Sequence, residues 1–97
     1  MSIYAVHYTY CDNADAIAAG RPAHRAYLGS LVEAGSLLAS GPYVDTAPDQ
    51  ALLIFSADSA EAVAAFLAGD PFQKDGLVAS HTITQWNPVL GVFAAQV

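Results

Sequence analysis

The sequence predicts an α+β fold of the β-α-β-β-α-β type, in which an antiparallel four-stranded sheet carries two helices on one face. Residues 3–10 and 80–86 show the period of two that is typical of strands, in which alternate side chains lie on opposite faces. Further strand-like and helix-like segments lie between them, and a polar turn around Pro48 separates two β-α-β halves. The 97 residues fit one domain, which we expect to cover residues 1–97.

The first strand is predicted over residues 3–10. At period two, Ile3, Ala5 and His7 lie on one face of this strand, and Tyr4 lies on the opposite face with the remaining alternate residues. The sequence therefore predicts that His7 points into a core or a cleft.

The first helix is predicted over residues 22–34. Residues 12–15 are turn formers, and Pro22 is a residue favoured at the first position of a helix. Gly35 follows the helix and supplies the left-handed residue that commonly ends one.

The remaining elements are a strand over 36–43, a strand over 51–55, a helix from 58 to 69 and a strand over 80–86. The first of these strands breaks at Pro42, because proline cannot donate to a strand ladder. Asp58 or Ser59 is expected to cap the second helix, and Gly69 to end it.

The charge of the chain excludes several classes of partner. Nine acidic residues against three basic ones give a net charge of −6, which would repel phosphate backbones and anionic membranes. No apolar run is long enough to span a bilayer, and the N-terminus lacks the basic start of a signal peptide. Cys11 is the one cysteine, as suits a reducing compartment. We expect a cytoplasmic protein that binds neither nucleic acid nor membranes.

The apolar fraction, 55%, is high for a chain of this length. Surplus apolar surface favours a homo-oligomer, most simply a closed dimer. The sheet face opposite the helices needs a cover, and two such sheets packed face to face would form a dimeric α+β barrel. The tail, residues 89–97, is expected either to cross to the partner subunit, to pack on its own chain or to fray.

His24 and Asp70 form the candidate catalytic pair. Within the predicted helix, His24 aligns with Leu28 and Leu31 on the inward face, and its place in the first turn favours a neutral imidazole. Asp70 precedes Pro71, which biases it towards an extended conformation. An Asp bonded to such a His would select its tautomer for general acid/base work. From spacing alone, a structural histidine and a turn-forming aspartate are the more frequent interpretation.

Three short motifs add to this pair: residues 21–24 (Arg-Pro-Ala-His), residues 40–42 (Ser-Gly-Pro) and residues 70–72 (Asp-Pro-Phe). Together with residues 76–77 (Gly-Leu) and the terminal strand containing Trp86, the chain resembles the YCII-related (YciI-like) family over nearly its whole length. The resemblance implies a ferredoxin-like dimeric α+β barrel, related in fold to muconolactone isomerase. It also implies an active site that contains the family's His and Asp. It carries over no substrate.

Those residues of this chain are His24 and Asp70. The departures from the family pattern are confined to residues 12–20 and the tail, which are expected to line the pocket and set its specificity.

Five further residues are candidates for contact with a substrate, and they are His7, Arg21, Ser40, Gly41 and Phe72. Arg21 is either an anchor for an anion or a solvated residue before the helix. Ser40 and Gly41 either present polar groups to a ligand or simply end a strand, and Phe72 forms either a pocket wall or core. His7 and His81 are expected to approach the same cavity. We expect no metal and no cofactor, because the histidines lack the spacing of metal ligands.

Three functions remain open at the level of the sequence. The first is a small cofactor-independent enzyme in which His24, oriented by Asp70, moves a proton on a small cyclic or aromatic substrate, as an isomerase or a lyase does. The second is a non-catalytic domain that binds a small ligand or serves as an accessory domain. The third is a structural role for the pair at a dimer interface.

Overall fold

The structure is a computed structural model that describes residues 1–96. It contains one antiparallel sheet with the strand order β2-β3-β1-β4. The strands are β1 (Ser2–Tyr10), β2 (Leu37–Pro42), β3 (Gln50–Ala57) and β4 (Val78–Trp86). All four predicted strands are confirmed, each within a few residues of its expected bounds.

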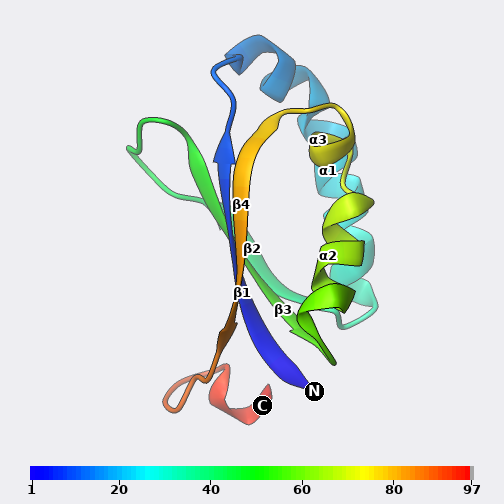
Figure 1. Cartoon of the computed structure of the whole chain (residues 1–97), viewed down its shortest axis with the longest axis vertical. Coiled ribbons are helices and arrows are strands. Elements are labelled where there is room, and N and C mark those ends of the chain that lie inside the picture. The colour runs from blue at the N-terminus through cyan, green and yellow to red at the C-terminus, as the bar shows by residue number, and fades with distance from the viewer. Residues whose placement is uncertain (97) are drawn as a thin grey trace.

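Helices α1 (Ala14–Glu33) and α2 (Ala60–Ala68) cover one face of the sheet, and the other face carries no helix (Figure 1). A short helix, α3 (Pro71–Lys74), joins α2 to β4, and a 3-10 turn spans Ala94–Gln96. The element order and the strand order are those of a ferredoxin-like fold, so the predicted fold class is confirmed.

The core lies between the sheet and the two long helices. In β1, Tyr4, Val6, Tyr8 and Tyr10 are all buried, because alternate side chains of the strand point towards the helices. The facing residues of β3 belong to the same core cluster, and Phe55 is fully buried in it. Strand β1 therefore places three tyrosine side chains beneath the helices.

Helix α1 begins well before Pro22, and the prediction that it starts there is wrong. Asn13 caps the helix, and its side chain accepts a hydrogen bond from the backbone N–H of Ala16 at 3.2 Å. Pro22 lies inside the helix, where it removes one backbone bond to Ala18. Both residues are exposed, so water can satisfy the carbonyl that proline leaves unbonded. The predicted end is confirmed, because Gly35 has a φ of +82°.

Helix α3 was not predicted, since residues 70–76 were expected to form only a connection. Asp70 caps it in an extended conformation and its side chain accepts a bond from the N–H of Phe72 at 3.0 Å, while Pro71 takes the first helical position. An aspartate followed by proline is therefore a helix start here. Ser59 caps α2 and Gly69 ends it, as predicted.

The tail packs partly on its own chain. Pro88 is buried, and the ring of Phe93 contacts that of Trp86 at a centroid distance of 6.0 Å. Val89, Leu90 and Val92 are exposed. Val97, the end of the predicted crossing tail, lies outside the described residues. Within residues 1–96, no helix has both the length and the apolar character needed to cross a bilayer.

Candidate active site

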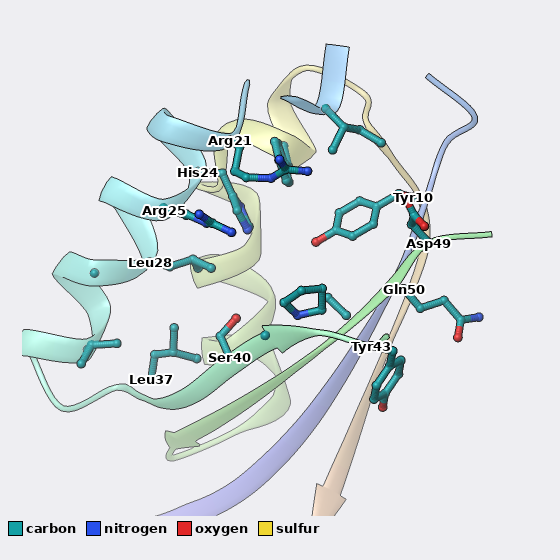
Figure 2. Close-up of a pocket in the computed structure, with 17 residues that line it drawn as sticks. Tyr10, Arg21, His24, Arg25, Leu28, Leu37, Ser40, Tyr43, Asp49 and Gln50 are labelled. Carbon is teal, nitrogen blue, oxygen red and sulfur yellow. The ribbon is translucent and has the colours of Figure 1, made fainter. Parts of the chain in front are cut away.

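A cavity of about 590 Å³ lies between α1 and the helix-facing side of the sheet (Figure 2). Its volume is in the range of small-molecule sites. Helix α1 supplies one wall, and the ends of β1, β2 and β3 supply the facing wall. The lining is mixed, with apolar side chains such as Leu28 and Leu37 beside histidine, arginine and tyrosine.

His24 projects from the middle of α1 into this cavity (Figure 2), although most of its surface is buried. Its Nδ1 lies 2.7 Å from Oδ1 of Asp70. Its ring stacks on Phe72, with 3.9 Å between centroids and 9° between planes. The inward direction of His24 was predicted correctly, but it does not lie in the first helical turn. The argument from the helix dipole therefore does not apply, and Asp70 and Phe72 are what hold the ring.

Asp70 is fully buried, and three donors converge on its carboxyl group. The backbone N–H of Phe72 and the Nδ1 of His24 contact Oδ1, at 3.0 Å and 2.7 Å. The hydroxyl of Tyr8 donates to Oδ2 at 2.9 Å. One carboxylate thus starts α3 and fixes the imidazole, and these contacts compensate the cost of burying its polar atoms.

This geometry sets the tautomer of His24. A carboxylate oxygen accepts, so the hydrogen of a neutral His24 belongs on Nδ1. The other ring nitrogen, Nε2, is then a proton acceptor beside the cavity. A neutral imidazole held in this way by an aspartate is the arrangement that general base catalysis needs.

Tyr8 is a member of this cluster that the sequence reasoning missed. Burial, and then the neighbouring charge of Asp70, raise the pKa of its hydroxyl far above the ordinary value, so it remains a donor. Its signal in the sequence was a hydroxyl-bearing residue at a core-facing position of a central strand, where a phenylalanine would pack as well.

The structure brings four of the five predicted contact residues to the cavity. Arg21, Ser40, Gly41 and Phe72 all line it. His7 does not line this cavity, and the prediction that it points into a core or a cleft is wrong. Because β1 alternates and Tyr8 faces the helices, His7 is exposed on the opposite face of the sheet.

The cavity residues that were not predicted include a second arginine and a tyrosine. Arg25 lines the cavity one helical turn after Arg21, and Tyr10 reaches it from the end of β1. Burial, followed by the charge of Asp70, raises the pKa of Tyr10 to about 12, so its hydroxyl is protonated at neutral pH. Ile17, from the segment expected to set specificity, also lines the cavity.

His81 lies outside the cavity lining, and its Nδ1 is 3.2 Å from the side-chain nitrogen of Gln73. No group of three or more His, Cys, Asp or Glu side chains arranged to hold a metal ion occurs among the residues that the structure describes.

A comparison with known protein families identifies the family of this chain. The model of the YCII-related domain matches residues 2–87. The chain belongs to this family. The predicted resemblance is thereby confirmed, and the His24 and Asp70 cluster lies within the matched region. A comparison with curated proteins found no match.

Two solved structures show the same fold. One is the 5-chloro-2-hydroxyhydroquinone dehydrochlorinase from Burkholderia phenoliruptrix AC1100 in complex with 2,5-dihydroxybenzoquinone, with a TM-score of 0.75 and 24% identity over 87% of this chain and 92% of that one. The other is an antibiotic biosynthesis monooxygenase, with a TM-score of 0.58 and 16% identity over 93% of this chain and 100% of that one. At these identities the likeness establishes the fold.

Proposed function

We propose that this member of the YCII-related family is a small enzyme that needs no cofactor and uses His24 and Asp70 for general acid/base proton transfer. The substrate is a small cyclic or aromatic molecule, and the reaction is an isomerisation or an elimination. The observation that carries the proposal is the 2.7 Å contact between Nδ1 of His24 and Oδ1 of a fully buried Asp70 at the edge of an open cavity.

The chemistry follows from the free nitrogen of the imidazole. Nε2 of His24 takes a proton from a carbon or hydroxyl group of the substrate while Asp70 stabilises the imidazolium that forms. In an isomerisation the proton returns to another atom of the substrate. In an elimination the electron pair expels a leaving group instead. The dehydrochlorinase of similar fold is named for such a loss of hydrogen chloride, which supports the elimination class.

Deuterium incorporation tests the proposal without knowledge of the final product. The protein is incubated in D₂O with a panel of cyclic enols, lactones and chlorinated hydroquinones, and NMR follows exchange at carbon while an electrode follows chloride. We expect at least one compound to react, and His24→Ala to slow that reaction by about 10²-fold or more. His81→Ala, which removes a histidine outside the cavity, is the matched control.

The alternative is a domain that binds a small ligand without turning it over. If His24→Ala keeps the full rate while its circular dichroism spectrum matches that of the wild type, the proposed catalytic role of His24 is wrong. If the variant loses its fold instead, His24→Gln replaces the ring with an amide that can still contact Asp70, and its rate decides the question.

We also propose a homodimer in the cytoplasm. The sheet face without helices carries Ala5, Leu52 and Thr84, which are small or apolar side chains suited to contact with a second copy of the sheet. Light scattering is expected to give twice the chain mass, and Leu52→Glu is expected to give single chains. A single-chain mass for the wild type would contradict the dimer. Cell fractionation tests the cytoplasmic location.

A further inference from the structure

The basic residues of this acidic chain are concentrated at one place. The sequence contains three lysine and arginine residues against nine acidic ones, and the three are Arg21, Arg25 and Lys74. Both arginines line the cavity, whereas Lys74 does not. In Figure 2 the side chains of Arg21 and Arg25 extend from α1 towards the cavity on either side of His24. The cavity is therefore where we expect a negatively charged ligand to have its most favourable electrostatic interaction with this protein.

The two arginines also repel each other. They are four residues apart on α1, so their side chains share one helix face, and like charges at this spacing destabilise a helix. No carboxylate among residues 1–96 lies within 4.0 Å of either guanidinium group. Asp49 also lines the cavity, but Figure 2 shows it on the wall opposite α1. A bound anion would relieve the repulsion that the chain itself leaves in place.

Tyr10 provides an independent observation. It is 9% exposed, and its hydroxyl has no hydrogen-bond partner within the described part of the chain. Figure 2 shows this hydroxyl directed into the cavity, towards the side on which His24 and the arginines lie. The charge of Arg21 acts on the Tyr10 hydroxyl and lowers its pKa, against the larger effect of burial. Because this hydroxyl is open to the cavity rather than enclosed by protein, it is free to donate to an acceptor on a ligand bound there.

The rest of the lining suits a flat ring. Leu28 and Leu37 are buried side chains on the two walls, and the ring of Phe72 meets that of Tyr10 edge to face with 5.6 Å between centroids. Flat apolar and aromatic walls bind planar rings through area and edge-to-face contacts. The two arginines lie at one side of this apolar space, next to His24.

We propose that the cavity selects a planar ring that carries an anionic oxygen group, either a carboxylate or an ionised phenol, with the oxygen held by Arg21, Arg25 and the Tyr10 hydroxyl. This names the substrate class of the proposed enzyme and rests on that function for its catalytic meaning. The same groups stabilise negative charge that develops on the substrate when His24 removes a proton. The binding itself requires no turnover.

Benzoate and benzamide separate charge from shape, because they are planar rings of nearly equal size. Calorimetry at low salt is expected to show that the wild type binds benzoate at least about tenfold more tightly than benzamide. The double variant Arg21→Gln/Arg25→Gln is expected to lose that preference. Lys74→Gln removes a positive charge outside the cavity and is expected to keep it. Added salt is expected to weaken the binding of benzoate and to leave the binding of benzamide unchanged.

A second pair of measurements distinguishes the two anionic groups. The ionised form of 4-nitrophenol absorbs visible light, so its ionisation can be followed while it is bound. If the cavity takes phenolates, the bound phenol ionises at a lower pH in the wild type than in the double arginine variant. If only benzoate shows the charge preference, the class is the carboxylate.

Equal affinity for benzoate and benzamide, or an equal loss in Lys74→Gln and in the arginine variant, would overturn the proposal. His24→Ala keeps both arginines and Tyr10 and is expected to retain the preference for benzoate. If the protein prefers benzoate but turns over no substrate, this inference holds and only the proposed catalysis is wrong.

Discussion

Tyr8 on β1 donates its hydroxyl to Oδ2 of Asp70 at 2.9 Å, although the two residues are 62 positions apart in the chain. The bond joins the central strand to the short helix α3 beneath the long helix α1. Because both residues are essentially unexposed, neither polar group has water as an alternative partner. The pair therefore fixes the position of the carboxylate from which His24 takes its orientation.

Tyr8→Phe is expected to lower the free energy of unfolding by about 1–3 kcal/mol, since it leaves one oxygen of a buried carboxylate without its donor. Urea titration followed by circular dichroism measures this change. Tyr4→Phe alters a buried tyrosine of the same strand that is not part of the Asp70 cluster, and it is the matched control. Equal losses in the two variants would show that the Tyr8 bond contributes nothing specific.

Asp70→Asn is expected to separate the two roles of this residue. Asparagine caps helices as well as aspartate does, so α3 should persist. The His24 ring loses the charged acceptor that holds its hydrogen on Nδ1, and both tautomers should then be populated. Nitrogen-15 NMR of the imidazole reads the tautomer directly. Asp75→Asn, at the exposed end of α3, is the control and is expected to leave the His24 signals in place.

The stability of the protein is expected to fall steeply above about pH 10. Burial raises the folded pKa of Tyr10 to about 12, whereas an unfolded tyrosine ionises near its ordinary value of about 10. The stabilisation is complete below about pH 10 and is lost as pH rises towards 12, because only the unfolded chain releases the proton in that window. The slope from Tyr10 is at most about 1.4 kcal/mol per pH unit.

Urea titrations between pH 8 and pH 12 measure this slope, and Tyr10→Phe is expected to make it shallower. Tyr43→Phe removes an exposed tyrosine and serves as the control. An unchanged slope in Tyr10→Phe would contradict the assignment.

Gly69→Ala is expected to destabilise the fold by about 1–3 kcal/mol. Gly69 has an ordinary φ of −82°, but a methyl group there would overlap the hydroxyl of Tyr27, which donates to the carbonyl of Phe66 at 2.6 Å. Gly29→Ala is the opposite case, because that helical position has open space around it. It should gain up to about 1 kcal/mol. Thermal unfolding compares the two, and a stable Gly69→Ala variant would show that Tyr27 moves freely.

Most of the fold could be predicted because the periodicity of its strands survives in the final packing. In β1 the alternation is seen from Tyr4 to Tyr10, where every second residue is buried, whereas in β4 only Val78 and Ile83 are even half-buried. The start of α1 could not be read from Pro22, because a proline on the exposed side of a helix is tolerated where water satisfies the unbonded carbonyl. Asn13, which caps α1, marks the actual start of this helix.

The site was predicted in part. The pairing of His24 with Asp70 came from a family resemblance, since the spacing of the two residues alone favoured structural roles. Tyr8, Tyr10 and Arg25 were missed because each looks ordinary in sequence, as two strand tyrosines and a helix arginine. Only the packing of β1 beneath α1 shows that Tyr8 reaches Asp70 and that Tyr10 and Arg25 line the cavity.

The convergence of distant segments on Asp70 has a consequence for how the protein folds. Its partners lie 62 and 46 positions away, on β1 and α1, and long chain closures form late because they cost more entropy than local contacts. During refolding, helical circular dichroism should therefore return before the His24 ring acquires its native environment. The native environment of His24 would then report the last step of folding.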